Sequence, residues 1–138
     1  MTEELLVWII DDDDISKYVM KRNLKELGIL NPVEFPDSIE PLEILSENRT
    51  NVLALPDIIF LDLNMPILNG FQFLEELKTF NKEIDKKIHI FMLTSSMNDD
   101  DESYAKSVSE ISEYFIKPIK LEQLAYAVEN ITEEIKQA

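Results

Sequence analysis

Apolar residues gather in five short runs along this chain, and amphipathic segments separate the runs. The runs cover residues 5–10, 33–35, 58–61, 88–93 and 114–116. A short apolar run bounded by polar residues is typical of a strand that is covered on both faces of a parallel sheet. We therefore predict five strands, of which 33–35 has the weakest pattern.

Between the runs, apolar positions recur with helical spacing. The first such segment, residues 15–27, ends before Gly28, a residue type that commonly terminates helices. Its apolar residues near one face are Ile15, Tyr18, Val19, Leu24 and Leu27. Further helices are predicted over 39–45, 71–80, an acidic segment at 98–108, and 121–135, where Leu121, Leu124, Val128, Ile131 and Ile135 form the clearest stripe.

The alternation of strand and helix predicts an α/β fold, a doubly wound five-stranded parallel sheet with helices on both faces. Ligands of such sheets bind beyond the carboxyl ends of the strands. The polar residues directly after the apolar runs are Asp11, Asp12, Asp62, Thr94 and Lys117. These residues are therefore the candidates for a functional site.

Carboxylates dominate the predicted strand ends. The first run stops on four aspartates, 11–14, and the third run stops on Asp62. Clustered like charges repel one another unless a cation compensates them, and Mg²⁺ prefers such oxygen ligands. We predict a divalent cation site at Asp11, Asp12 and Asp62, with Mg²⁺ as the expected ion and Mn²⁺ as a substitute.

The register of the aspartate run leaves an alternative open, in which Asp12 and Asp13 form the metal pair. We prefer the earlier pair because the apolar run ends at Ile10. Asp13 and Asp14 are then expected to cap the following helix, where carboxylates are favourable.

Composition narrows the function further. The chain has 138 residues, enough for one domain over 1–138, and a formal net charge of -15. An excess of acidic residues argues against binding nucleic acid through its phosphates. The absence of cysteine excludes disulfides, thiolate nucleophiles and cysteine-bound zinc. No apolar stretch is long enough for membrane insertion, so we expect a soluble, cytoplasmic protein.

Four motifs stand in order at the predicted strand ends. They are Asp11-Asp12, the stretch 60–66 (Phe-Leu-Asp-Leu-Asn-Met-Pro) with Gly70 beyond it, Leu93-Thr94-Ser95, and 114–118 (Tyr-Phe-Ile-Lys-Pro). In this order the sequence resembles the receiver domains of two-component response regulators, of which the single-domain chemotaxis regulator is an example. The resemblance covers essentially the whole chain and implies a flavodoxin-like fold with strand order 2-1-3-4-5.

The resemblance implies a phosphorelay role. Asp62 would be the phosphoacceptor that takes a phosphoryl group from a phosphohistidine, on a histidine kinase or a histidine phosphotransfer protein. Asp12 would ligate Mg²⁺ directly, Asp11 through a water, and Asn64 through its backbone carbonyl. Such a domain catalyses only its own phosphorylation and dephosphorylation, so we expect no enzyme with an external substrate.

The same resemblance assigns supporting roles. Lys117 and Thr94 would bind the phosphoryl oxygens, with Ser95 small enough to leave room, and the Lys117–Pro118 peptide bond would be cis. Asn64 and Ser96 would tune dephosphorylation. Tyr114 would be a switch aromatic that changes the surface of the fourth helix, fifth strand and fifth helix, including Tyr104 and Ile111, toward a downstream protein. Taken singly, Thr94 and Tyr114 could be ordinary strand residues, Lys117 could be a solvated loop residue, and His89 receives no role.

Other functions fit the sequence less well. A receiver-like scaffold that is never phosphorylated would keep the fold without the chemistry. A phosphohydrolase with an aspartyl-phosphate intermediate would resemble a pattern with an acid two residues after the nucleophile, where this chain has Asn64. A calcium loop built on the aspartate run would need glycine at its sixth position, which is Ser16. A phosphate shuttle, a phosphate sink, an effector and a fragment of a larger regulator or hybrid kinase remain open.

Overall fold

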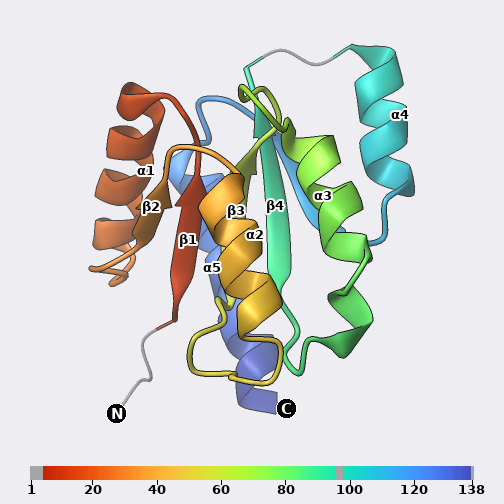
Figure 1. Cartoon of the computed structure of the whole chain (residues 1–138). Helices are drawn as coiled ribbons and strands as arrows, with labels where there is room; N and C mark the ends of the chain where they lie inside the picture. The colour runs from red at the N-terminus through yellow and green to blue at the C-terminus, as the bar shows by residue number, and fades with distance from the viewer. Residues whose placement is uncertain (1–4, 96–97, 138) are drawn as a thin grey trace.

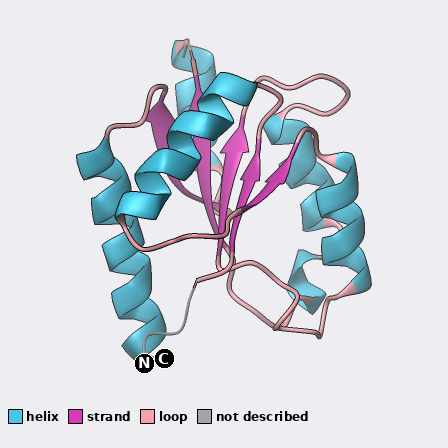
Figure 2. Ribbon diagram, turned by 90° about the vertical axis from the view of Figure 1, so that its left-hand side faces the viewer, coloured by secondary structure: helices cyan, strands magenta, loops and turns pink. Residues whose placement is uncertain are grey.

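The computed structural model describes residues 5–95 and 98–137 and has a five-stranded parallel sheet with helices on both faces (Figure 1, Figure 2). The strands are β1 (Val7–Ile10), β2 (Val33–Phe35), β3 (Ile58–Asp62), β4 (His89–Thr94) and β5 (Ile111–Ile116). The helices are α1 (Asp14–Glu26), α2 (Ile39–Glu47), α3 (Gly70–Lys78), α4 (Asp99–Ser107) and α5 (Leu121–Gln137), with a 3-10 turn at Asn81–Glu83. The order β2-β1-β3-β4-β5 confirms the predicted flavodoxin-like fold.

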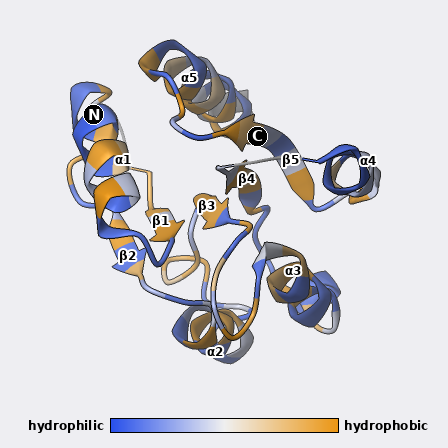
Figure 3. Cartoon of the chain, turned by 90° about the horizontal axis from the view of Figure 1, so that it is seen from above, coloured by the Kyte–Doolittle hydropathy of each residue, from blue (hydrophilic) through white to orange (hydrophobic). Residues whose placement is uncertain are grey.

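Two apolar cores hold the sheet between its helical layers. Viewed from above, α1 and α5 cover one face while α2 and α3 cover the other (Figure 3). Successive residues of a strand point to opposite faces, so Ile9 packs into the α1–α5 core and Ile10 into the α2–α3 core. β1, β3 and β4 are buried along their whole length, which fixes the positions of their carboxyl ends.

The predicted face of the first helix was partly wrong. Ile15 and Tyr18 are 74% and 62% exposed, and Val19 is also exposed, whereas Met20 and Leu24 are buried. α1 packs near one edge of the sheet against β1 and α5, so only a narrow stripe with a spacing of four residues is covered. Its sequence periodicity indicates a helix but does not reveal how wide the covered stripe is.

Other differences concern the ends of elements and the last helix. β5 begins at Ile111, three residues earlier than predicted. The prediction missed this start because Ser112 and Glu113, which are exposed on this edge strand, interrupt the apolar run. Polar residues at an exposed edge hide the apolar run that sequence reasoning looks for. At the far end of α5, Ile135 is 39% exposed and does not belong to the core.

Among residues 5–95 and 98–137, no helix is both long enough and apolar enough to cross a membrane.

Candidate functional site

Two buried carboxylates lie side by side at the carboxyl end of the sheet. Ile10 of β1 is in register with Leu61 of β3, so Asp11, which follows β1, lies at the same level as Asp62, the last residue of β3. Asp11 is 3% exposed and Asp62 is 4% exposed. The exposed Asp12 joins them, and one carboxylate oxygen from each of the three lies within 4.8 Å of the others. Three oxygen donors this close together form an acidic triad suited to a hard divalent cation.

Asp13, unlike Asp11 and Asp12, caps the N-terminus of α1. Its side chain accepts hydrogen bonds from the backbone N–H groups of Ile15 and Ser16 and, at 2.6 Å, from the Ser16 hydroxyl. The bond from Ser16 lowers the pKa of Asp13, consistent with a carboxylate that caps a helix N-terminus. The pair that faces Asp62 is therefore Asp11 and Asp12, and Asp13 is the N-cap of α1.

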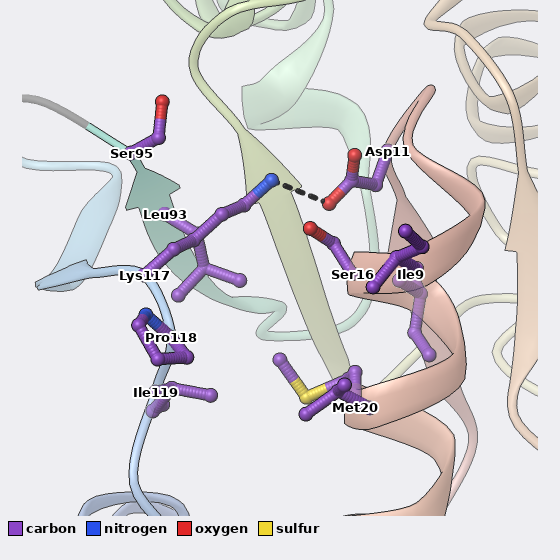
Figure 4. Close-up of a pocket in the computed structure, with 11 residues that line it drawn as sticks. Ile9, Asp11, Ser16, Met20, Leu93, Ser95, Lys117, Pro118 and Ile119 are labelled. Atoms are coloured by element: carbon purple, nitrogen blue, oxygen red, sulfur yellow. Dashed lines mark hydrogen bonds and ion pairs between the residues drawn. The ribbon is translucent and has the colours of Figure 1, made fainter.

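Lys117 provides the positive charge of the site. Its Nζ donates to Asp11 Oδ2 at 2.8 Å and lies 3.4 Å from Asp62 Oδ1, and Figure 4 shows it reaching from the end of β5 toward Asp11. Burial lowers the pKa of Lys117, but the bonds and charges of Asp11 and Asp62 outweigh that effect and leave the pKa above its usual value. The lysine is therefore a charged partner of the acids. The peptide bond from Lys117 to Pro118 is cis.

The charge state of Asp62 reflects its surroundings. Burial, followed by repulsion from Asp11, raises the pKa of Asp62 to about 6, and Lys117 offsets part of the rise. The backbone N–H of Asn64 also donates to Asp62 Oδ1 at 3.3 Å. At neutral pH the carboxylate is mostly ionised but lies in an unfavourable place, so a cation beside it would be stabilising.

A hydroxyl lies at the end of the neighbouring strand. Thr94 ends β4 and is fully buried, and its Oγ1 accepts a hydrogen bond of 3.1 Å from Asn64 Nδ2. Tyr114 of β5 packs against the α2–α3 core with its phenolic oxygen buried. Burial raises the pKa of Tyr114, and an interaction with the Thr94 side chain counteracts part of the rise. Thr94 thus joins the loop after β3 to the end of β4, beside the strand that carries Tyr114.

An apolar cavity opens beside the acids, between α1 and the loop that follows β5 (Figure 4). Its volume is about 260 Å³. Its polar lining residues are Asp11, Ser16, Ser95 and Lys117, and its apolar walls include Ile15, Val19, Met20, Leu93 and Ile119. The exposed Ile15 and Val19 of α1 are therefore walls of this cavity. Ser96, predicted to tune dephosphorylation, lies outside the described residues.

Sequence reasoning named Gly70 as part of a motif but missed its steric role, and it missed the backbone conformation of Ile67. A Cβ at Gly70 would approach the Asp62 carbonyl oxygen and the Leu63 Cα to 3.0 Å, so a larger residue would push against the backbone of the acceptor. Gly70 is one of two glycines in the chain, a scarcity that could have pointed to this steric role. Ile67 adopts a positive φ of 71°, which nothing in its β-branched side chain would have predicted.

Comparison with known proteins agrees with this geometry. Residues 7–129 match the family described as Response regulator receiver domain. The chain is 28% identical over 132 residues to the probable methanogenesis regulatory protein FilR2 of Methanothrix harundinacea, covering 95% of this chain and 83% of that protein. It is 30% identical over 125 residues to the sensor histidine kinase CheAY of Helicobacter pylori, covering 91% of this chain but 15% of that protein.

Solved structures show the same fold. A two-component response regulator from Cytophaga hutchinsonii superposes with a TM-score of 0.79 at 22% identity, covering 99% of this chain and 100% of that chain. The chemotaxis protein CheY4 of Vibrio cholerae superposes with a TM-score of 0.72, also at 22% identity, covering 94% of this chain and 99% of that chain. The arrangement of sheet and helices is thus shared over essentially the full length.

Proposed function

The chain belongs to the response regulator receiver domain family, and from this membership we propose that it is a phosphoacceptor switch of a two-component system. Receiver domains are signalling modules, typically without enzymatic activity, that take phosphoryl groups from histidine kinases. In this chain Asp62 is the acceptor. The observation that carries the proposal is that Asp62 is buried among Asp11, Asp12 and Lys117 at the end of β3.

The reaction follows from the positions of these side chains. A carboxylate oxygen of Asp62 attacks the phosphorus of a phosphohistidine, the new O–P bond forms, and the P–N bond breaks as the imidazole leaves with its electron pair. Phosphoryl transfer depends mainly on positioning and charge neutralisation. Lys117 Nζ, 3.4 Å from Asp62 Oδ1, neutralises one phosphoryl oxygen, and the Thr94 hydroxyl donates to another. Ser95 is small enough to leave room for the group.

The oxygen ligands fit Mg²⁺, or Mn²⁺ in its place. Asp12 and Asp62 would bind the ion directly, Asp11 through a water, and Asn64 through its backbone carbonyl. The triad spacing of 4.8 Å or less and the hard oxygen donors support this assignment. When bound, the ion neutralises the acids and the negative charge of the incoming phosphoryl group.

The proposed output is a change in the surface formed by α4, β5 and α5. Phosphorylation adds a charge of about -1.5 to -2 that attracts hydroxyl and ammonium donors. Thr94 ends β4 and Tyr114 lies on the neighbouring β5, so their rearrangement biases two states of that surface. The phosphodonor would be a histidine kinase or a histidine phosphotransfer protein, and the receiver of the signal a further protein. The net charge of -15 argues against direct binding of nucleic acid.

Incubation with Mg²⁺ and acetyl phosphate tests the proposal. Intact-mass spectrometry should detect one added phosphoryl group on the wild type and none on Asp62→Asn. Asp85→Asn is the matched control, because Asp85 is exposed and lies in the loop that leads into β4, at the opposite end of the sheet. An unmodified wild type would favour a non-phosphorylated scaffold. Release of phosphate from a phosphoester in many-fold excess over protein would instead indicate a phosphohydrolase.

A further inference from the structure

The side chain of Asn64 connects two strands beside the acceptor. Asn64 follows β3 two residues after Asp62, and its Nδ2 donates to Thr94 Oγ1 on β4 at 3.1 Å. Its backbone N–H donates to Asp62 Oδ1, the oxygen that also lies 3.4 Å from Lys117 Nζ. Asn64 therefore contacts both the acceptor and the hydroxyl that the phosphoryl group needs.

We propose that Asn64 is a positioning residue, whose amide holds the Thr94 hydroxyl in the unphosphorylated state and so opposes the switch. This inference rests on the proposed function, because it concerns how the same site responds to phosphoryl. It assigns to the Asn64 side chain a role separate from that of its backbone carbonyl, and the two can be separated because alanine at this position keeps the carbonyl.

Asn64 and a phosphoryl group on Asp62 would compete for the Thr94 hydroxyl. A phosphoryl group on Asp62 brings three strong acceptor oxygens into the space where the Asn64 and Lys117 donors meet. The Thr94 hydroxyl must then turn toward these oxygens, which breaks its bond with the Asn64 amide and leaves that amide to water. Because Thr94 is β-branched and fully buried, its hydroxyl moves between a few discrete rotamers. The bond between Asn64 and Thr94 is thus a feature of the resting arrangement.

Linkage gives the expected direction. A contact present only in the resting state lowers the affinity of the protein for any ligand that requires the switched state. One neutral hydrogen bond corresponds to about a two- to tenfold change in affinity. Loss of the Asn64 amide should therefore tighten the binding of a phosphoryl analogue by about that factor.

A double-mutant cycle with beryllofluoride and Mg²⁺ tests the inference, with affinity measured by titration. Asn64→Ala should bind beryllofluoride about two- to tenfold more tightly than the wild type. In a Thr94→Val background, which keeps the shape but removes the acceptor oxygen, the same substitution should change nothing. Asn51→Ala, an exposed asparagine in the loop before β3 at the far end of the sheet, is the control and should match the wild type.

A second readout does not depend on any variant folding. In the wild type, the side-chain amide resonance of Asn64 should shift when beryllofluoride binds, because its acceptor changes. Equal or weaker binding by Asn64→Ala, or an equal gain in both backgrounds, would overturn the role, since Asn64 would then act on the ion or on water. A wild type that neither binds beryllofluoride nor accepts phosphoryl overturns the proposed function itself, whereas a phosphorylated wild type without coupling overturns only this inference.

Discussion

Ile67, in the loop between β3 and α3, combines backbone strain with little burial. Its φ is 71° and its side chain is 72% exposed. A β-branched residue in the left-handed region costs about 1–2 kcal/mol, whereas asparagine tolerates that region. We expect Ile67→Asn to raise the free energy of unfolding by about 1 kcal/mol, measured by urea denaturation. Leu53→Asn, at a site 89% exposed, should give no such gain, and a destabilised Ile67→Asn would mean that the isoleucine packs favourably.

Asp62 makes stability depend on pH in a direction opposite to that of most carboxylates. Its pKa is raised from 3.8 to about 6, so the folded protein holds the proton more tightly than the unfolded chain does. The resulting stabilisation is present below the unfolded pKa and is lost as pH rises through about 6. We expect Asp62→Asn without metal to be more stable than the wild type by about 1–2 kcal/mol at neutral pH, and by less near the unfolded pKa. Urea unfolding of both proteins in chelator, at neutral pH and near the unfolded pKa, checks this. A difference in unfolding free energy that does not change with pH would contradict it.

α4 is fixed to its neighbour by side-chain contacts more than by burial. Within this fully described helix Ala105 alone is buried. The ring of Tyr104 packs edge-on against the ring of Phe71 of α3, with 4.7 Å between the ring centroids. Its hydroxyl donates a hydrogen bond of 3.0 Å to Glu75 Oε1. These contacts tie a helix of the proposed output surface to the element that begins next to Asp62. α4 should therefore open locally at a lower free energy than the core helices.

Removing this attachment should loosen α4 selectively. We expect Tyr104→Ala to speed amide hydrogen exchange in residues 99–107 by about 5- to 30-fold, since an aromatic pair and a hydrogen bond to a charged group together contribute about 1–2 kcal/mol. Exchange in α5 should stay unchanged. Tyr126→Ala, an exposed tyrosine on α5, is the control and should leave α4 as it is. Equal exchange in wild type and Tyr104→Ala would show that other contacts hold the helix.

The sequence was sufficient to predict which residues lie at the site, but not which hydrogen bonds join their side chains. Parallel strands end at one edge of a sheet, so apolar runs ending on Asp11, Asp62 and Thr94 already imply a shared site. The bond from Asn64 to Thr94 depends on rotamers and on the path of the loop after β3, which periodicity does not encode. The covered stripe of α1 and the start of β5 were missed for a similar reason, because both depend on what packs against an element.

Because the whole chain is acidic, we expect salt to stabilise it in two ways, by general charge screening and by specific binding of Mg²⁺. With a formal charge of -15, the folded protein repels itself at low ionic strength, and monovalent salt screens this repulsion over a Debye length of about 10 Å at 0.1 M. Added NaCl should therefore raise the urea midpoint of wild type and of Asp12→Asn alike.

Mg²⁺ should stabilise further only where the acidic triad is complete. At a hundredfold excess over its dissociation constant, a ligand of the folded state adds about 2.7 kcal/mol. We expect this increment, measured by urea unfolding at constant ionic strength, in the wild type and in Asp85→Asn but not in Asp12→Asn. Asp12 is exposed, so its substitution leaves the core intact and removes one oxygen of the triad. An equal response of all three proteins to Mg²⁺ would mean that the ion acts through general charge screening and that the triad binds nothing.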